Sequence, residues 1–587
     1  MGFLKSWLDG FKPAVNVAYG TEPSYADTDG ISTYEKASVL GRDEFANTAV
    51  AVKTENNGVA FVPEKTALKR NLAGRHIQFI ALGGSIGTGL FIGSGSAYAE
   101  GGPGSLMIAF LVIAVMLVTT VFALGELAAV LPVSGAFSTY STRFVDPSWG
   151  VAMGWNYWLQ WLVALPLELT AATIIIQFWD SEEVVPKGVW IAIGLLIIIA
   201  INLFGVRGYG EFEFIASLLK VIGCIGFIIC AIVIDCGGTP GTPGSEGYLG
   251  ARGWHVPGYG AFVNGFKGFC SIFITAAFAF SGTELVGLAA AETSNPRKQL
   301  PKAAKQVLFR VLIFYILSLF MITLIVPPNM QELNGSGDGN DPRASPFVIA
   351  IQIGGIKALP QIFNAVILIS ALSVANASVY GASRTLLALA EQGGAPPIFK
   401  YVDREGRPLP AVIVSLLFGL LGFLIYYASQ STVFDWLLAI SGLSSIFAWA
   451  STCLAHIRFR KAWKLEGNPL SLLPWASPLG ELGSWVGLSL NIIVVCAAFY
   501  EAAFPIGESE MNASDRANAF FQSMISLPIV LVFFLLHKLI SRSRYVRLNE
   551  IDIHTGRRDP VSLEVLEEER AEERAKPLFW KIFDAIF

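Results

Sequence analysis

Four ionisable side chains fall inside apolar segments of this chain, and they set the chemistry that has to be explained: Glu126, Glu168, Lys220 and Glu284. Charged groups are costly inside a bilayer, so those that persist there usually serve substrates, ions or protons. A carboxylate or an amine held away from water can take up or release a proton when its surroundings change. The four residues are therefore candidates for proton transfer, for substrate contact or for ties between helices.

Lys220 lies nine residues beyond Glu211, which places it about 13 Å into the membrane if the segment is helical. One possible role is proton coupling, in which the lysine ammonium takes the place of the sodium ion of related transporter designs. The alternative is a structural lysine paired with a nearby glutamate. The cost of burying an amine favours the coupling role.

The three glutamates have less determined roles. Glu284 could neutralise a substrate ammonium, carry a proton or accept hydrogen bonds from exposed backbone amides, and we favour the last two together. Glu168 is either a second proton-relay carboxylate or a tie between two helices. Glu126 sits nearer one membrane face, and we expect it to stabilise an inner gate.

The elements that position these residues are transmembrane helices. Of the 587 residues, 53% are hydrophobic and 15% are charged, against about 25% charged in ordinary soluble domains. Since about 20 helical residues cross the hydrocarbon layer, we predict an all-α integral membrane protein with twelve spans. The predicted spans are residues 77–99, 105–131, 149–178, 188–206, 211–235, 263–290, 308–328, 358–383, 410–429, 433–456, 483–501 and 520–539.

The distribution of Lys and Arg predicts the orientation, because cytoplasmic flanks carry the excess. Twenty-three of these residues flank the predicted inner ends, against six at the outer ends: Lys187, Arg252, Lys267, Arg343, Lys357 and Arg516. Two sequons, at Asn334 and Asn512, fall in predicted outer loops, which agrees. We expect a cytosolic N-terminal tail over residues 1–75, a transporter domain over 76–541 and a cytosolic C-terminal tail over 542–587.

The first span contains the stretch ALGGSIGTGLFIGSG, residues 81–95, in which six of fifteen residues are glycine. It lacks the Lys-Ser/Thr of a phosphate loop. One interpretation is close helix packing, since Gly83 and Gly87, like Gly89 and Gly93, form GxxxG pairs. The other is an unwound helix that binds a ligand with bare backbone groups, which requires a second break in an equivalent span.

Such a partner occurs in the sixth predicted span, where FAFSGTELVG, residues 278–287, repeats the Gly-Thr pair. Breaks five spans apart predict two inverted repeats of five helices, with spans 11 and 12 appended. Free N–H groups and helix N-termini attract an anion, while bare carbonyls attract a cation. An α-amino acid carries both a carboxylate and an ammonium, so it fits both kinds of backbone group.

Other chemistries find little support. The five histidines are scattered, so no cluster has the spacing of metal ligands. The six cysteines show no CxxC spacing and are interpreted as packing residues, with a Cys236–Cys270 bridge as the alternative. We expect no enzyme activity, no cofactor, no metal and no nucleic-acid partner.

Six stretches together resemble the fungal amino-acid permeases of the amino acid, polyamine and organocation transporter superfamily. They are RHIQFIALGGSIGTGLF (75–91), PVSGAF (132–137), GTELVG (282–287), AETSNPRK (291–298), SRTLLALAEQG (383–393) and HIRFR (456–460). The resemblance implies the leucine-transporter-like fold and proton-driven import of amino acids at the plasma membrane.

The resemblance also implies roles for particular residues. Those that would hold the substrate carboxylate are Ser85, Gly87, Thr88 and Gly89. Those whose carbonyls would hold the amino group are Phe278, Ala279 and Ser281, with Phe278 as an aromatic gate. Those that would line the side-chain region are Asn376, Ser441 and Ser444, although serines in spans also serve as helix-to-helix hydrogen bonds. The proton-coupling set would be Lys220, Glu284 and Glu168.

We therefore expect a proton-coupled permease for neutral or a broad range of amino acids, surrounded by membrane lipid. The family also implies ubiquitin-ligase machinery acting on cytosolic lysines such as Lys5, Lys12, Lys53 and Lys65. The alternative is a non-transporting amino-acid receptor on the same fold.

Overall fold

The computed structural model describes residues 48–53, 59–64, 83–180, 182–241, 248–288, 295–333, 345–557, 563–575 and 577. Most of the predicted N-terminal tail, with Lys5, Lys12 and Lys65, lies outside these residues, as does Asn334. The tail's described part is a two-stranded antiparallel sheet, in which β1 (Thr48–Lys53) pairs Thr48 with Glu64 and Lys53 with Val59 of β2 (Val59–Glu64).

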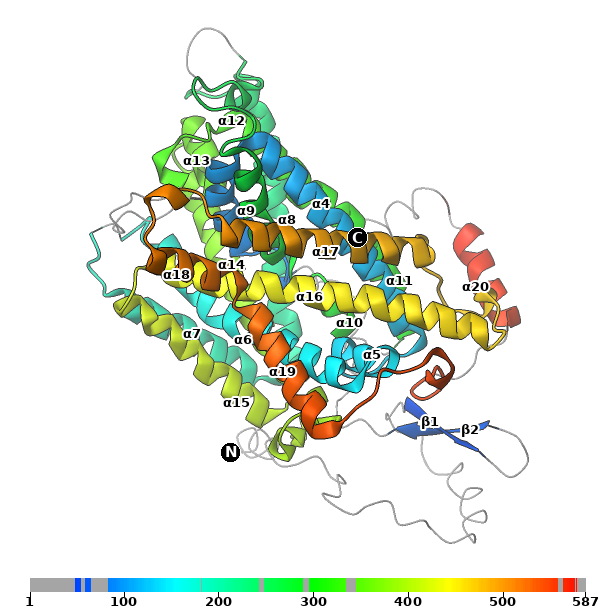
Figure 1. The fold of residues 1–587 in the computed structure, drawn as a ribbon. Coiled ribbons are helices and arrows are strands. Elements are labelled where there is room, and N and C mark those ends of the chain that lie inside the picture. Colours follow the sequence, from blue (N-terminus) through cyan, green and yellow to red (C-terminus); the bar gives the residue numbers. More distant parts are fainter. Residues whose placement is uncertain are drawn as a thin grey trace, which may run out of the picture.

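The rest of the described chain is helical (Figure 1). The longer helices are α4 (Ser94–Val130), α5 (Ala136–Phe144), α6 (Pro147–Ile176), α7 (Lys187–Leu203), α8 (Gly205–Asp235), α9 (Gly265–Phe280), α11 (Pro296–Arg310), α14 (Leu359–Glu391), α15 (Leu409–Phe418), α16 (Gln430–Leu465), α17 (Gly480–Ala503), α18 (Ala513–Met524), α19 (Ser526–Ser541) and α20 (Leu563–Ala575). The shorter ones are α10 (Leu285–Leu288), α12 (Ser318–Ile325), α13 (Pro346–Ile353), the π-helices η2 (Gly89–Gly93) and η5 (Val311–Leu317), and the 3₁₀ helices η3 (Arg252–Trp254), η6 (Gln331–Leu333), η7 (Pro397–Lys400), η8 (Gly419–Tyr426), η9 (Leu470–Leu472), η10 (Glu508–Glu510) and η11 (Leu548–Glu550).

Eight helical stretches in the described residues are long and apolar enough to cross a membrane, or nine if the bent pair α18 and α19 is one span. Two shorter apolar helices, α7 and α9, accompany them. The predicted first and second spans share one stretch, because the chain bends within α4 at Gly102, with φ of 78°, and Pro103 rather than forming a loop. The total of twelve spans stays a prediction.

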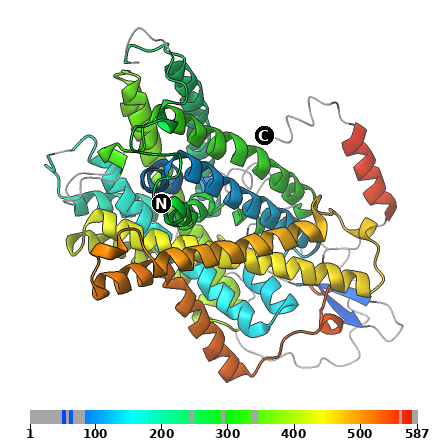
Figure 2. The ribbon, with the colours of Figure 1, turned by 45° about the horizontal axis from the view of Figure 1, so that its top comes forward.

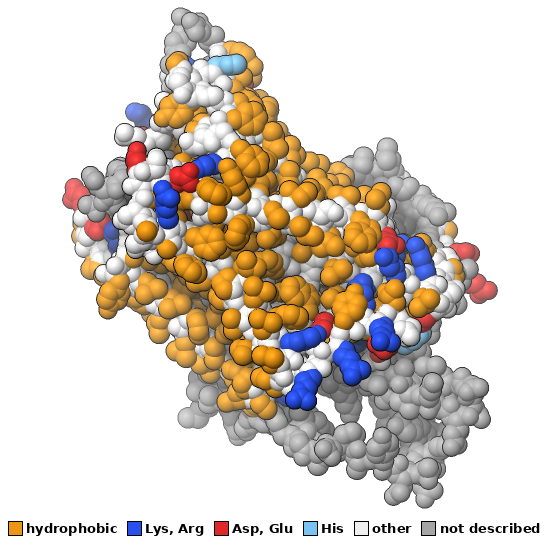
Figure 3. All heavy atoms as spheres, viewed as in Figure 1, with side chains coloured by type: hydrophobic (Ala, Val, Ile, Leu, Met, Phe, Trp, Pro, Cys, Tyr) orange, Lys and Arg blue, Asp and Glu red, His pale blue; other side chains and the backbone are white. Residues whose placement is uncertain are grey.

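The helices pack around a continuous apolar core. Helix α14 lies along α6, α4 lies along α9, and α16 runs beside α17 in both ribbon views (Figure 2). Trp161, Trp449 and Trp463 are almost fully buried. The outer surface is rich in apolar side chains, unlike the surface of a soluble protein. Large apolar side chains of α17 and α19, such as Ile493 and Leu535, are exposed. Figure 3 shows this apolar surface with Lys and Arg gathered toward one end.

That end is called the basic end here and is defined by Arg143, Arg458, Arg460, Lys538 and Arg542. The start of the predicted C-terminal tail packs against it. Val546 N donates a hydrogen bond to Val145 O at 3.0 Å, and Ile553 is 0% exposed within the core that contains Phe459.

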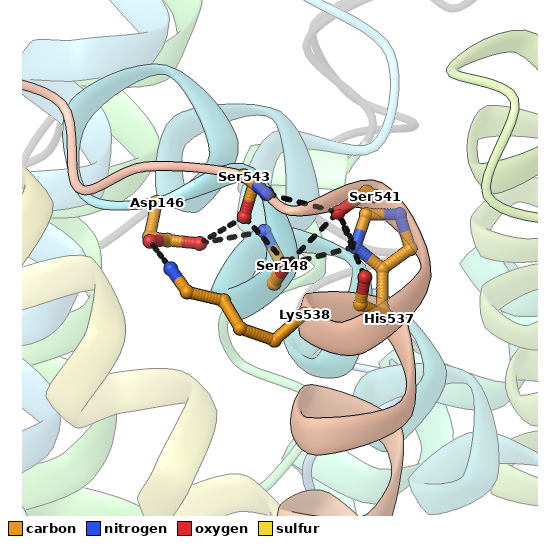
Figure 4. Close-up of polar contacts among 6 residues, drawn as sticks. All are labelled: Asp146, Ser148, His537, Lys538, Ser541 and Ser543. Atoms are coloured by element: carbon orange, nitrogen blue, oxygen red, sulfur yellow. Dashed lines mark hydrogen bonds and ion pairs between the residues drawn. The ribbon is translucent and has the colours of Figure 1, made fainter.

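The end of α19 is fixed to the start of α6 by a polar cluster (Figure 4). Asp146 caps α6, accepting from Ser148 N at 2.8 Å, and Pro147 at the next position suits a first helical turn. The same carboxylate accepts from Ser543 Oγ at 3.0 Å and pairs with Lys538. Ser148 Oγ contacts His537 Nδ1 at 2.9 Å and Ser543 Oγ at 2.6 Å. Residues 542–557 therefore belong to the packed structure of the basic end.

Candidate functional site

The structure interrupts the helices at both predicted breaks. Residues 84–87 are non-helical before η2, and residues 281–284 are non-helical between α9 and α10. Gly282 has φ of 96°, a conformation that side chains rarely adopt. A Cβ atom there would lie 3.1 Å from Ser85 N and closer still to the Gly84 carbonyl. The two breaks therefore touch, and glycine is required for that approach.

A second close approach occurs one helical turn further on. A Cβ atom on Gly89 would lie 2.7 Å from Ala279 Cα and 2.7 Å from the ring of Phe278. Small residues let helix backbones approach in membranes. Gly89 therefore serves close packing and residues 84–87 form a break, while ligand binding by the break stays a prediction.

A small cavity lies between the breaks and two further helices, α6 and α14. Its lining residues are Gly84, Ser85, Gly87, Gly89, Trp161, Ala164, Glu168, Phe278, Ser281 and Val374. Six of the predicted site residues are thereby brought together: Ser85, Gly87, Gly89, Phe278, Ser281 and Glu168.

Glu168 joins the first break to α6. Thr88 Oγ1 donates a hydrogen bond to Glu168 Oε1 at 2.9 Å, and both side chains are almost completely buried. A Cβ atom on Gly87 would lie 3.3 Å from the same carboxylate oxygen. The contact fits the tie between helices that the sequence offered as one alternative, and the relay role stays a prediction.

Glu284 supports the second break from within. Its Oε2 accepts a hydrogen bond from Gly282 N at 3.0 Å, which satisfies an amide that the broken helix leaves bare. Gln160 Nε2 of α6 donates to Glu284 Oε1 at 3.3 Å and to Ser281 Oγ at 3.0 Å. The expectation that Glu284 binds freed amides agrees with this geometry, while its proton role stays a prediction.

Lys220 lies behind the first break and is 0% exposed. Its Nζ donates to Gly83 O at 2.5 Å and to Ser373 Oγ of α14 at 2.9 Å. The Lys220 side chain therefore holds a backbone carbonyl at the start of the break.

Glu213 is a buried carboxylate that sequence reasoning missed. It is 0% exposed and accepts hydrogen bonds from Ser373 Oγ at 2.7 Å and Asn376 Nδ2 at 3.0 Å. It lies two residues inside the predicted fifth span, which begins at residue 211. A helical signal was available, since Glu213, Ser217 and Lys220 are spaced i, i+4 and i+7 and so share one helix face.

The three residues expected to line the substrate side-chain region lie elsewhere than among the ten lining residues. Asn376 bonds Glu213 and accepts from Asn202 Nδ2 at 3.0 Å. Ser444 Oγ donates to Ser526 Oγ at 3.2 Å, which is a helix-to-helix hydrogen bond. Ser441 is 1% exposed. Substrate contact for these three stays a prediction.

Glu126 forms a separate cluster at the basic end. Arg460 of α16 binds it through two nitrogens, at 2.6 Å and 2.5 Å, and Ser477 N donates to it at 2.6 Å. The Nε2 atom of His456 lies 3.1 Å from Glu126 Oε1. Glu126 thus joins α4, α16 and the segment before α17.

Comparison with known proteins identifies the family of the chain. The sequence model of the amino acid permease family matches residues 76–550. The chain belongs to the amino acid permease family. The permease is 48% identical to a general amino-acid permease of Candida albicans over 538 residues, covering 91% of this chain and 89% of the relative.

Two further relatives are similar over comparable lengths. A general amino-acid permease of Saccharomyces cerevisiae is 48% identical over 542 residues, covering 90% of the permease and 88% of the relative. A protein of Schizosaccharomyces pombe named cationic amino acid transporter 1 is 48% identical over 523 residues, covering 88% and 86%. The permease is therefore a multi-pass membrane protein of amino-acid transport.

Proposed function

We propose that this permease imports amino acids across the plasma membrane together with protons. The observation that carries the proposal is the cavity between the two touching helix breaks. Gly84, Ser85 and Gly87 of the first break lie on one side of it, and Phe278 and Ser281 at the end of α9 lie on the other. Backbone groups at helix breaks suit the two charged groups of an α-amino acid.

In this proposal the amides around Ser85, Gly87, Thr88 and Gly89 hold the carboxylate. The carbonyls of Phe278, Ala279 and Ser281 then hold the amino group. Both sets are backbone groups, so they recognise what all α-amino acids share. Selectivity would arise at the remaining walls, which Trp161, Ala164 and Val374 contribute.

We infer a neutral or broad substrate range from the character of those walls. They are mainly apolar or small, and the one carboxylate among them, Glu168, already accepts a hydrogen bond from Thr88. The names of the relatives, which include general amino-acid permeases and a cationic amino acid transporter, are compatible with a broad range.

The distribution of charge supports an orientation of the permease in the membrane. The excess of Lys and Arg at the basic end favours placing that end in the cytosol. The described tail segments, residues 48–53, 59–64, 542–557 and 563–575, then belong to the cytosolic side. Lys220, Glu168 and Glu284 are the groups we assign to proton coupling.

Uptake of labelled amino acids by cells stripped of their own permeases tests the proposal. Neutral, acidic and basic amino acids are supplied at acidic and neutral external pH, with and without an uncoupler. We expect accumulation that rises at acidic pH and collapses with the uncoupler. Correct surface delivery without uptake of any amino acid would leave the receptor as the better description.

A matched pair of glycine variants tests the cavity itself. A Cβ atom at Gly87 would lie 2.7 Å from Val374 and intrude on the cavity, whereas one at Gly226 of α8 meets no heavy atom within 4 Å. We expect Gly87→Ala to raise the KM for uptake and Gly226→Ala to leave it unchanged. Equal effects of both variants would count against this cavity as the substrate site.

A further inference from the structure

A chain of hydrogen bonds connects Lys220 to a second buried charge, and its donors and acceptors are ordered. Lys220 Nζ donates to Ser373 Oγ at 2.9 Å. The Ser373 hydroxyl in turn donates to Glu213 Oε2 at 2.7 Å. A hydroxyl that accepts from an ammonium and donates to a carboxylate is arranged to pass a proton from the first to the second.

The other side of the Glu213 carboxylate is held in place by two amides. Asn376 Nδ2 donates to Glu213 Oε1 at 3.0 Å, and Asn202 Nδ2 donates to Asn376 Oδ1 at 3.0 Å. Asn202 belongs to α7, one residue before that helix ends at Leu203. Amides do not readily relay protons, so these two residues position Glu213 and leave its Oε2 atom for Ser373.

Both charges also lie against the first helix break. Lys220 donates to Gly83 O at 2.5 Å. A Cβ atom on Gly83 would lie 3.3 Å from Glu213 Cδ and 2.8 Å from Ser217 Oγ. The carboxylate and the amine therefore meet at the residue where the span begins to unwind.

Burial makes the pair sensitive to its protonation state. Glu213, Lys220 and Ser373 are each 0% exposed. An ion pair held away from water is expensive to desolvate, and a neutral amine with a neutral acid avoids that cost. Glu168 of α6 and Cys224 of α8 are further titratable groups that act on Lys220.

We propose that Glu213 is the internal proton acceptor for Lys220, with Ser373 as the relay, and that this transfer releases the first helix break. An N–H bond of Lys220 breaks as its proton passes to Ser373 Oγ, and the former Ser373 proton forms an O–H bond on Glu213 Oε2. An ammonium and a carboxylate become an amine and a carboxylic acid, so net charge is unchanged and no oxidant is required.

Gly83 links this proton transfer to the bound substrate. A charged donor makes the stronger hydrogen bond, so a neutral Lys220 holds the Gly83 carbonyl less tightly. Residues 84–89 then loosen and release the carboxylate they bind. Glu213 subsequently loses the proton to water entering from the basic end, and Lys220 takes a new proton from the outer side. This inference rests on the proposed function, since it concerns the coupling step of the same transporter.

The test compares Glu213→Gln with Glu211→Gln, a matched control two residues away whose side chain is exposed. Each variant is purified into proteoliposomes, and two quantities are measured: exchange of labelled for unlabelled amino acid, and accumulation driven by an imposed pH gradient. Exchange requires the substrate site and the conformational cycle but no net proton movement.

Glutamine at position 213 resembles the protonated acid and removes the counter-charge of Lys220, so it holds the break in its released state. We therefore expect Glu213→Gln to retain exchange and to lose the accumulation that the parent shows, about tenfold per pH unit for each coupled proton. Glu211→Gln should behave as the parent. Ser373→Ala should lower gradient-driven accumulation, and Ser373→Thr, which keeps a hydroxyl, should restore it. The pH profile of uptake should flatten in Glu213→Gln and in Ser373→Ala.

Other results overturn the proposal. Accumulation by Glu213→Gln equal to that of the parent would show that this carboxylate accepts no coupled proton. Equal losses of exchange and accumulation in both Glu213→Gln and Ser373→Ala, without a change in pH profile, would assign the cluster a structural role. A parent that exchanges amino acids but never accumulates them would instead refute proton-coupled import, a distinguishable failure.

Discussion

The Nζ atom of Lys220 lies 2.5 Å from the carbonyl oxygen of Gly83, a residue 137 positions earlier in the chain. The contact joins α8 to the point where the first span stops being helical. A carbonyl freed from its helix needs a donor when it is buried. Lys220 supplies that donor, so the proposed coupling group and the unwound segment form one unit.

Replacing Lys220 by Met should therefore abolish the coupling between proton movement and the conformation of the first helix break. The variant keeps most of the side-chain volume but leaves Gly83 O without this donor, which costs about 1–3 kcal/mol for a buried acceptor. We expect loss of gradient-driven accumulation, measured as the ratio of internal to external substrate. Lys187→Met, at the partly exposed start of α7, is the control and should accumulate normally. Normal accumulation by Lys220→Met would separate Lys220 from coupling.

Substitution of Gly282 by Ala should disable the contact between the two breaks. The positive φ alone costs roughly 1 kcal/mol for an alanine, and the added Cβ would collide with the Gly84 backbone. Gly258→Ala separates these effects, because Gly258 has φ of 81° but no heavy atom within 4 Å of the added Cβ. We expect a small loss of thermal stability in Gly258→Ala, and a larger loss with abolished uptake in Gly282→Ala. Similar behaviour of both would mean that the contact is unimportant.

The sequence predicted the positions of the two helix breaks better than it predicted the hydrogen-bond partners of the side chains around them. Glycine runs in two apolar segments and the charges at Glu168, Lys220 and Glu284 are local signals, and the structure gathers them around the breaks. The spacing of Glu213 from Lys220 was also a local signal, but its bonds to Ser373 and Asn376 needed tertiary information because they come from contact between α8 and α14. Asn376 was assigned to the substrate path on resemblance, whereas its amide bonds Glu213.

The same limit applies to the basic end. No local sequence pattern in the predicted tail indicated that Ile551 and Ile553 are buried in the core formed with α5 and α16. Two isoleucines in a polar stretch are not enough to predict burial. The arginines that fix this segment, such as Arg143, which donates to Thr555 O at 2.6 Å, were counted only as orientation signals. Charge counts predict the side of a membrane but not the contacts a charge makes.

The pair of Glu126 and Arg460 should dominate stability at the basic end. Removing one partner of a buried ion pair leaves the other uncompensated and typically costs about 3–5 kcal/mol. We expect Arg460→Met to lower the melting temperature strongly, as measured on protein in detergent. The partly exposed pair of Lys464 and Glu481, at 3.5 Å, offers the control, since Lys464→Met should cost no more than about 1 kcal/mol. Equal shifts in melting temperature would show that the buried pair is not stabilising.

The last prediction concerns the junction of α19 with α6. Burial alone would raise the pKa of Asp146, but hydrogen bonds from Lys538, the Ser148 backbone and Ser543, with the charge of Lys538, outweigh burial and lower that pKa. A lowered pKa contributes stability that is present above the ordinary aspartate value and is lost only as pH falls through the lowered value. Docking of residues 542–557 should therefore stay constant across neutral and mildly acidic pH.

Limited proteolysis of inside-out vesicles measures that docking, since Arg542, Arg544 and Arg547 are exposed sites for trypsin once the segment loosens. Asp146→Asn keeps the cap but removes the charge that Lys538 pairs with, so cleavage should be faster than in the parent at every pH tested. Glu567→Gln, on exposed α20, should leave the cleavage rate unchanged. Cleavage of the parent that accelerates between neutral and mildly acidic pH would contradict the assignment of Asp146 as the anchoring charge, because its carboxylate stays ionised over that range.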